Sequence, residues 1–127
     1  MWLDYTMFRP ADISHFYYLV TNRSIDPAEL MRAGRKLQNL ERSFNLLHAG
    51  FERKDDMPPA RFCETPVSRG PYKGERLEVD KWNDMLDSYY RLHAWDVKTG
   101  RPFKQTLLDL GLQIVVDAME RHAIQLG

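Results

Sequence analysis

The segment DPAELMRAGRKLQNLERSFNLLHAG, residues 26–50, contains the longest helical pattern in the chain and decides its fold class. Asp26 supplies an N-cap acceptor, Pro27 suits the first helical position, and Glu29 completes a capping box. The pattern continues to Gly50, a residue type that commonly ends helices. We therefore expect one central helix of about 23 residues, long for a globular domain. Its apolar, core-facing positions are predicted to be Leu30, Ala33, Leu37, Leu40, Phe44 and Leu47.

Further helices are predicted on both sides of this segment, and strand patterns are nearly absent. One precedes it over residues 10–22, with Ile13, Phe16, Tyr17 and Val20 as its apolar stripe. Those that follow are expected from Val79 or Asp80 to Trp95, in a short stretch ending at Leu110 before Gly111, and over about residues 113–124. The sequence predicts an all-α fold of four or five helices.

Residues 51–76 separate the second and third predicted helices and have no sustained hydrophobic period. They include Pro58, Pro59, Pro66 and Pro71 together with two glycines. Loops longer than about 15 residues are uncommon in compact domains unless they pack on something or carry a function. We expect an ordered, extended arm, with a short strand or helical turn near residues 60–63.

Length and charge limit the classes of protein to consider. The chain has 127 residues, so we expect a single helical domain over residues 1–127. Its 18 basic and 18 acidic side chains cancel, which gives no basic surface for nucleic acid. No apolar run approaches the roughly 20 residues that span a bilayer, and residues 1–4 lack the pattern of a signal peptide. With a single cysteine, the chain is predicted to be cytoplasmic, without nucleic-acid or membrane partners.

No catalytic, cofactor-binding or metal-ligating residue is predicted in this chain. An iron–sulfur cluster requires about four thiolates, and Cys63 is expected to be a small buried apolar residue instead. The four histidines lack the spacing of a metal site, and no Gly-x-Ser-x-Gly motif occurs. Residues 68–74 contain glycines and a lysine but not the Gly-Lys-Ser/Thr of a phosphate loop.

Two groups of side chains look chemical but have ordinary interpretations. The mixed-charge segment from Arg53 to Asp56 suits a solvated turn, or a loop pinned to a neighbouring domain by charge-assisted hydrogen bonds. Asp84, Asp87 and Asp96 with Glu78 could suggest paired carboxylates, but Asp80, Asp84 and Asp87 on a helix form an ordinary solvated ridge. The aromatic residues at helical spacing are predicted to pack in the core or between domains; they are Trp82, Tyr89, Tyr90 and Trp95.

A set of fragments in fixed order resembles the C-terminal end of the tungsten/molybdenum aldehyde:ferredoxin oxidoreductase family, over roughly residues 25–112. The fragments are Leu40-Glu41-Arg42-Ser43-Phe44-Asn45-Leu46, Gly50-Phe51, Arg53-Lys54-Asp55-Asp56, Pro58-Pro59, Arg61-Phe62, Gly70-Pro71, Lys73-Gly74, Leu86-Asp87-Ser88-Tyr89-Tyr90, Leu92, Trp95-Asp96 and Leu110-Gly111-Leu112.

The resemblance implies a part of an enzyme that oxidises an aldehyde to a carboxylic acid. The complete enzyme would hold a tungsto- or molybdopterin and a 4Fe–4S cluster, and would pass electrons to ferredoxin. Family members hold these groups mostly upstream of the matching segment. The chain is therefore expected to carry no cofactor, to be inactive alone, and to bind cofactor-binding domains on another chain or a second copy of itself.

The family pattern is not complete in this chain. Family members usually carry an arginine two residues after the asparagine that matches Asn45, followed by one residue and a glycine. Here Leu47 stands at the position of that arginine, and two residues, His48 and Ala49, precede Gly50. Arg42 is expected to complement the helix dipole, and Asn45 to bond the backbone of the arm. The family's fourth cluster cysteine would fall near or before Met7, where no cysteine stands.

Two other functions stay open at this point. The chain could be a stand-alone helical interaction module derived from the same domain. It could also belong to an enzyme of this scaffold with another reaction, such as aromatic acyl-CoA ring reduction.

Overall fold

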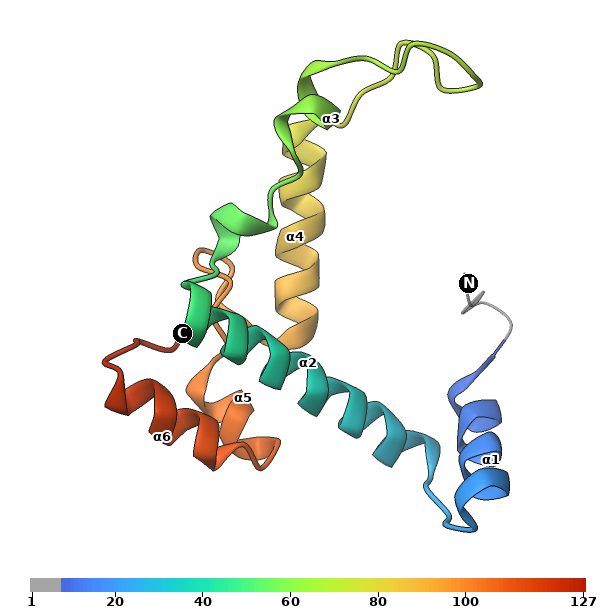
Figure 1. The fold of residues 1–127 in the computed structure, drawn as a ribbon, viewed down its shortest axis with the longest axis vertical. Helices are drawn as coiled ribbons and strands as arrows, with labels where there is room; N and C mark the ends of the chain where they lie inside the picture. The colour runs from blue at the N-terminus through green and yellow to red at the C-terminus, as the bar shows by residue number, and fades with distance from the viewer. Residues whose placement is uncertain (1–7) are drawn as a thin grey trace. The chain divides into compact units, whose positions relative to one another are not determined.

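The computed structural model describes residues 8–127, which form six α-helices and one short 3-10 helix (Figure 1). No strand occurs among these residues, and their isolated β-bridge joins Trp95 and Pro102. The predicted all-α class is confirmed, with an additional short helix, α3, in the arm. The elements are α1 (Pro10–Thr21), α2 (Pro27–Ala49), η1 (Arg53–Asp56), α3 (Ala60–Glu64), α4 (Val79–His93), α5 (Lys104–Asp109) and α6 (Gln113–Arg121).

The chain divides into two compact units, Met1–Gln38 and Asn39–Gly127, with the boundary inside α2. The single domain expected over residues 1–127 stays a prediction. In the first unit, α1 ends at Asn22, which adopts a left-handed conformation at φ 54°. The predicted stripe of α1 is exposed rather than buried; Val20, for example, is 85% exposed. Among the described residues, no helix is both long and apolar enough to cross a membrane.

The start of α2 confirms the predicted capping box. The Glu29 amide donates to Asp26 Oδ1 at 2.8 Å, and the Asp26 amide donates to Glu29 Oε2 at 3.3 Å. Two otherwise unpaired donors at the helix start are thereby satisfied.

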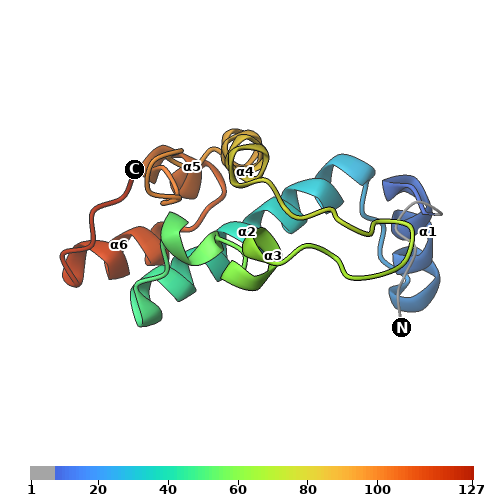
Figure 2. The same cartoon turned by 90° about the horizontal axis from the view of Figure 1, so that it is seen from above.

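The second unit has two buried clusters. The larger one joins the end of α2 to α5 and α6 and contains Leu46, Leu107, Leu110, Leu112, Val115, Val116 and Met119. Figure 2 shows α6 alongside the end of α2. The smaller cluster contains Leu86, Tyr90 and Trp95 and lies at the end of α4.

The second half of α2 buries a mostly polar face and exposes an apolar one. Its buried residues are Asn39, Arg42, Ser43 and Leu46. Phe44 is 60% exposed, so the prediction that it fills the core was wrong. The helical period was read correctly, but the inward face was assigned by hydrophobicity alone. In this helix Asn39 and Arg42 have hydrogen-bond partners inside the unit.

The arm is ordered by backbone hydrogen bonds and lies beyond the start of α4 (Figure 1). The Val67 amide donates to the Glu75 carbonyl at 2.8 Å, and the Gly74 amide donates to the Val67 carbonyl at 2.9 Å. The Leu77 amide donates to the Phe62 carbonyl at 2.9 Å, which closes the loop on α3.

Candidate functional site

A cluster of charged side chains lies where α2, η1, α4 and the turn before α5 meet. At its centre is Arg42, which is only 7% exposed. Its Nε donates to the Gly100 carbonyl at 2.9 Å, and its Nη1 donates to Asp56 Oδ1 at 3.0 Å. The second Asp56 oxygen lies 2.8 Å from Arg42 Nη2 and also accepts the Tyr90 hydroxyl. One charge-assisted hydrogen bond and a second close charge contact therefore join Arg42 to Asp56.

Arg53 forms the second centre of this cluster. Its Nη1 donates to Asp87 Oδ1 at 2.6 Å and to the Val97 carbonyl at 2.7 Å. Its Nη2 donates to Asn83 Oδ1 at 3.0 Å. Arg53 therefore ties η1 to α4 and to the following turn.

The mixed-charge segment thus pins a loop, but to α2 and α4 of its own unit. The sequence suggested contacts with a neighbouring domain, whereas the structure shows contacts within the unit. Only its outer residues, Arg53 and Asp56, enter the cluster, whereas Lys54 and Asp55 are exposed. A one-turn 3-10 helix places residues three apart on the same side, which explains the division.

Aromatic rings lie against the two guanidinium groups, with Tyr90 near both of them. The Arg42 guanidinium carbon lies 5.8 Å from the Tyr90 ring centre and 5.1 Å from that of Trp95. The Trp95 indole donates to Asn39 Oδ1 at 2.9 Å. Burial is the main reason, and the hydrogen bond to Asp56 the second, that the pKa of the Tyr90 hydroxyl is raised well above its usual value. Tyr90 therefore stays a neutral donor to the carboxylate.

The turn before α5 presents its backbone to Arg42. Asp96 Oδ2 accepts the Thr99 hydroxyl at 2.6 Å and the Thr99 amide at 3.1 Å. The Thr99 hydroxyl bond is the main reason that the pKa of Asp96 is lowered. Gly100 follows at φ 71°, and an added Cβ there would overlap the Arg42 guanidinium.

The arrangement suits holding elements together better than acid–base chemistry. Asp56 and Asp87 are both paired with arginines. Asp87 therefore does not belong to the solvated ridge that the sequence predicted, while Asp80 and Asp84 are exposed as expected. The cluster leaves no carboxylate free to exchange a proton with a substrate.

Two expectations about the end of α2 also change. Arg42 serves the ion pair with Asp56 rather than the dipole of its helix. The start of the arm is bonded by the backbone carbonyl of Asn45, which accepts the Phe51 amide at 3.3 Å, and not by the side chain.

The described residues do not fit a tungsten, molybdenum or iron–sulfur centre. No group of three or more His, Cys, Asp or Glu residues able to hold a metal ion occurs within residues 8–127. Cys63, expected to be buried, lies half-buried on α3. The position near or before Met7, where the family's cluster cysteine would fall, lies outside the described residues.

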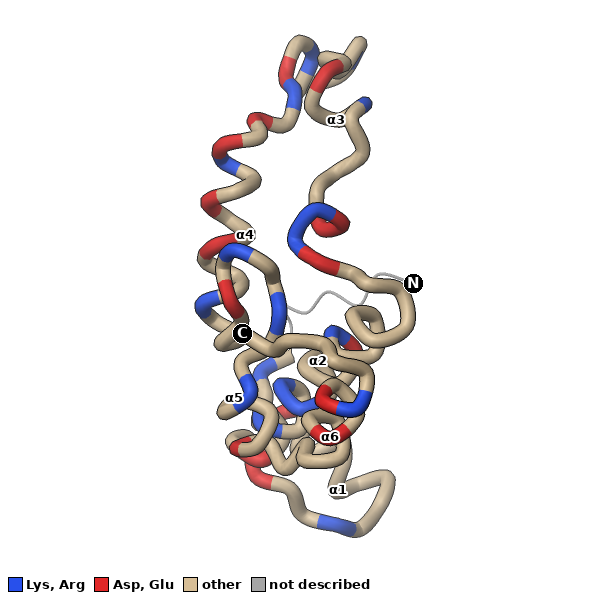
Figure 3. The backbone as a smooth tube through the Cα atoms, turned by 90° about the vertical axis from the view of Figure 1, so that its left-hand side faces the viewer, with Lys and Arg blue, Asp and Glu red and all other residues tan. Residues whose placement is uncertain are grey.

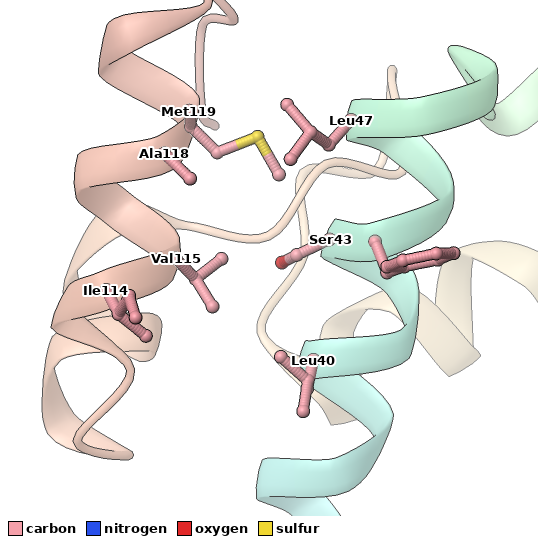
Figure 4. Close-up of a pocket in the computed structure, with 8 residues that line it drawn as sticks. Leu40, Ser43, Leu47, Ile114, Val115, Ala118 and Met119 are labelled. Carbon is pink, nitrogen blue, oxygen red and sulfur yellow. The ribbon is translucent and has the colours of Figure 1, made fainter.

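An apolar groove runs between α2 and α6 (Figure 4). It has a volume of about 200 Å³. Ile114, at its edge, is 73% exposed. Its walls are formed by Leu40, Ser43, Phe44 and Leu47 of α2 and by Ile114, Val115, Ala118 and Met119 of α6.

Phe44 and Leu40 also line a second hollow on the neighbouring side of α2, together with Glu41 and Asn45. The Phe44 ring is therefore a ridge between two depressions. Glu41 is exposed and makes no ion pair within residues 8–127.

Sequence reasoning missed both the Arg42–Asp56 pair and the exposed groove. One signal was present for the first: Asn39, Arg42, Ser43 and Leu46 recur at helical spacing, so a polar stripe accompanies the apolar one. No comparable signal marks the groove, because it requires α6 beside α2.

Comparison with known proteins agrees with this architecture. Residues 1–112 match the family model described as aldehyde ferredoxin oxidoreductase, domains 2 and 3. The chain is 36% identical over 85 residues to the tungsten-containing aldehyde ferredoxin oxidoreductase of Pyrococcus horikoshii, and 34% identical over 84 residues to that of Pyrococcus furiosus. These matches cover 67% and 66% of the chain, and 13% of each relative.

A solved structure shares the fold over most of the chain. It is the active-site complex BamBC of benzoyl coenzyme A reductase in complex with 1,5-dienoyl-CoA. The match has a TM-score of 0.69 and 29% sequence identity, and it covers 94% of this chain and 16% of that one.

The matches define an all-α domain that forms a small part of longer chains in its relatives. The chain belongs to the aldehyde ferredoxin oxidoreductase family, and it spans about 13% of the length of the curated relatives it matches.

Proposed function

We propose that this chain is the C-terminal domain, a fragment or a split subunit of an aldehyde ferredoxin oxidoreductase-like enzyme. The complete enzyme would oxidise an aldehyde to a carboxylic acid and transfer electrons to ferredoxin. The observation that carries this proposal is the family match over residues 1–112. In this role the chain closes the cofactor and substrate channel, and the metallopterin and cluster are held elsewhere.

The charged cluster supports such a role. It joins α2, η1, α4 and the turn at Gly100 through buried or half-buried ion pairs. A wall that borders a channel must keep its shape while substrate enters and product leaves. Hydrogen bonds to charged groups each contribute about 1.5–3 kcal/mol, so several of them hold these elements firmly.

A second candidate is a place in an aromatic acyl-CoA reductase of the same scaffold. The similarity to the benzoyl coenzyme A reductase complex supports it, because that solved structure shares the fold over 94% of this chain at 29% sequence identity.

Two hybrid enzymes test both candidates. In each, this chain replaces the segment that it matches, either in the Pyrococcus furiosus enzyme or in the benzoyl coenzyme A reductase chain. The first proposal predicts a soluble aldehyde-enzyme hybrid that retains tungsten and reduces a dye when aldehyde is added. Assembly of the reductase hybrid alone would favour the second candidate. Failure of both would favour a stand-alone interaction module.

A further inference from the structure

The groove between α2 and α6 exposes an unusual amount of apolar side chain for an ordered part of a folded unit. Phe44 is 60% exposed, Ile114 73% and Leu40 42%. They adjoin one another around a hollow of about 200 Å³. A cavity of roughly 150 Å³ accommodates a benzene molecule, so this hollow has room for one large apolar side chain.

The position of the groove on α2 indicates a second neighbour for this helix. Arg42 lies on the buried face of α2, whereas Leu40 and Phe44 lie on an exposed face that borders the core at Ser43 and Leu47. An exposed apolar stripe beside the core of an otherwise packed helix is normally covered by another element.

The length of the relatives indicates where that element belongs. This chain corresponds to 13% of each aldehyde enzyme and to 16% of the reductase chain. The reductase match covers 94% of this chain, so these helices recur there within a chain several times longer, while the aldehyde enzymes match over 84 or 85 residues. Residues able to cover the groove are therefore available in the remainder of such a chain.

The charge beside the groove specifies the partner further. Glu41 lines the adjoining hollow with Asn45, and none of the residues lining either depression is basic. A partner with lysine or arginine opposite Glu41 is complementary to this surface.

We propose that the groove between α2 and α6 binds an apolar helix from the cofactor-binding part of the enzyme, with a basic side chain opposite Glu41. This inference rests on the proposed function and identifies the surface through which the chain joins the rest of the protein. Phe44 would be the ridge over which the partner helix packs.

Cysteine labelling in the hybrid with the Pyrococcus furiosus enzyme tests the inference. Phe44→Cys and, as a control, Leu92→Cys are each made in a Cys63→Ser background. Leu92 is 71% exposed, on α4. Maleimide should modify Phe44→Cys about tenfold more slowly in the hybrid than in the free chain, because a packed helix must open first. Leu92→Cys should react at similar rates in both.

The outcomes separate the inference from the proposed function. A hybrid that retains tungsten while Phe44→Cys reacts as fast as in the free chain overturns the groove assignment alone. Equal protection at both positions also overturns it, because burial would then not be specific to the groove. A hybrid that neither assembles nor retains tungsten overturns the proposed function and this inference with it.

A charge placed in the groove provides an independent measurement. Ile114→Asp should reduce the yield of assembled hybrid about tenfold or more, since an unpaired carboxylate would be buried at the contact. Leu92→Asp, a change at a residue of similar exposure, should leave the yield unchanged. If the free chain instead forms a dimer that Ile114→Asp abolishes, the occupant is a second copy and the proposed partner is wrong.

Discussion

Arg42 shows how a single residue can organise several elements. It is an arginine on the inward face of a helix, where burial of an unpaired charge would be very unfavourable. Asp56 neutralises it, and the Gly100 carbonyl accepts the hydrogen bond that its Nε donates. Truncating Arg42 would leave a half-buried Asp56 without a counter-charge, and truncating Asp56 would leave a buried Arg42 without one.

Gly100 is predicted to tolerate no side chain. Gly100→Ala combines a left-handed backbone, at about 1–2 kcal/mol, with overlap on Arg42 and Tyr90. We expect the free energy of unfolding in urea to fall by about 2 kcal/mol or more. Gly34→Ala is the matched control, because no atom lies within 4 Å of the Cβ that it would add. It should leave stability unchanged or raise it by roughly 0.5–1 kcal/mol; equal losses in both variants would contradict the assignment.

Tyr90 should make stability depend on alkaline pH. Its folded-state pKa is raised by burial and by Asp56, so its contribution is complete below about pH 10 and declines above it as the unfolded tyrosine ionises. Tyr90→Phe should lose about 1.5–3 kcal/mol at pH 8. The difference between parent and variant should shrink by about 1 kcal/mol at pH 11. A difference that stays constant in denaturation curves at the two pH values would exclude this coupling.

At the scale of elements, η1 connects the arm to α2 and α4 through its first and last residues, Arg53 and Asp56. Arg53→Ala removes bonds to Asp87, Asn83 and the Val97 carbonyl, and should lower the free energy of unfolding by about 2–4 kcal/mol. Lys54→Ala, one residue along and exposed, should change it by less than about 0.5 kcal/mol. Thermal or urea unfolding that fails to separate the two variants would show that η1 does not depend on the cluster.

The two faces of α2 should respond oppositely to truncation. Leu46→Ala removes a side chain that is 3% exposed and should lower stability by about 2–5 kcal/mol. Phe44→Ala should lower it by less than about 1 kcal/mol in the free chain, since the ring is 60% exposed. A larger loss for Phe44→Ala would contradict the exposed position of this ring in the structure.

For the whole molecule, the net charge does not favour a partner of either sign. Basic and acidic residues are interspersed along the helices, as Figure 3 shows, and they sum to zero at pH 7. Recognition at the scale of the chain must therefore come from apolar surface with local charges such as Glu41. Low net charge also weakens the repulsion that keeps exposed apolar surfaces apart.

The isolated chain is predicted to bind no stoichiometric metal and to oxidise no aldehyde. It has one cysteine, and no three potential ligands gather within residues 8–127. Elemental analysis of purified protein should find tungsten, molybdenum and iron well below one atom per chain. A stoichiometric metal, or dye reduction that depends on aldehyde, would require ligands that the described residues do not offer.

The sequence by itself determined the helical class, the start of α2 and the family. Helix periods and capping residues act between neighbours along the chain, so Asp26 and Glu29 could be paired before any fold was known. The fragments from Leu40 to Leu112 identified the family because their order does not depend on geometry.

Only the tertiary structure decided which face of α2 is inward and what the charged segment does. Arg42 and Asp56 are 14 residues apart, and Gly100 lies 58 residues beyond Arg42. Their pairing depends on long-range packing that no local pattern encodes. For the same reason Phe44 was assigned to the core, since a hydrophobic stripe indicates that a helix face will be covered but not whether the cover comes from its own unit.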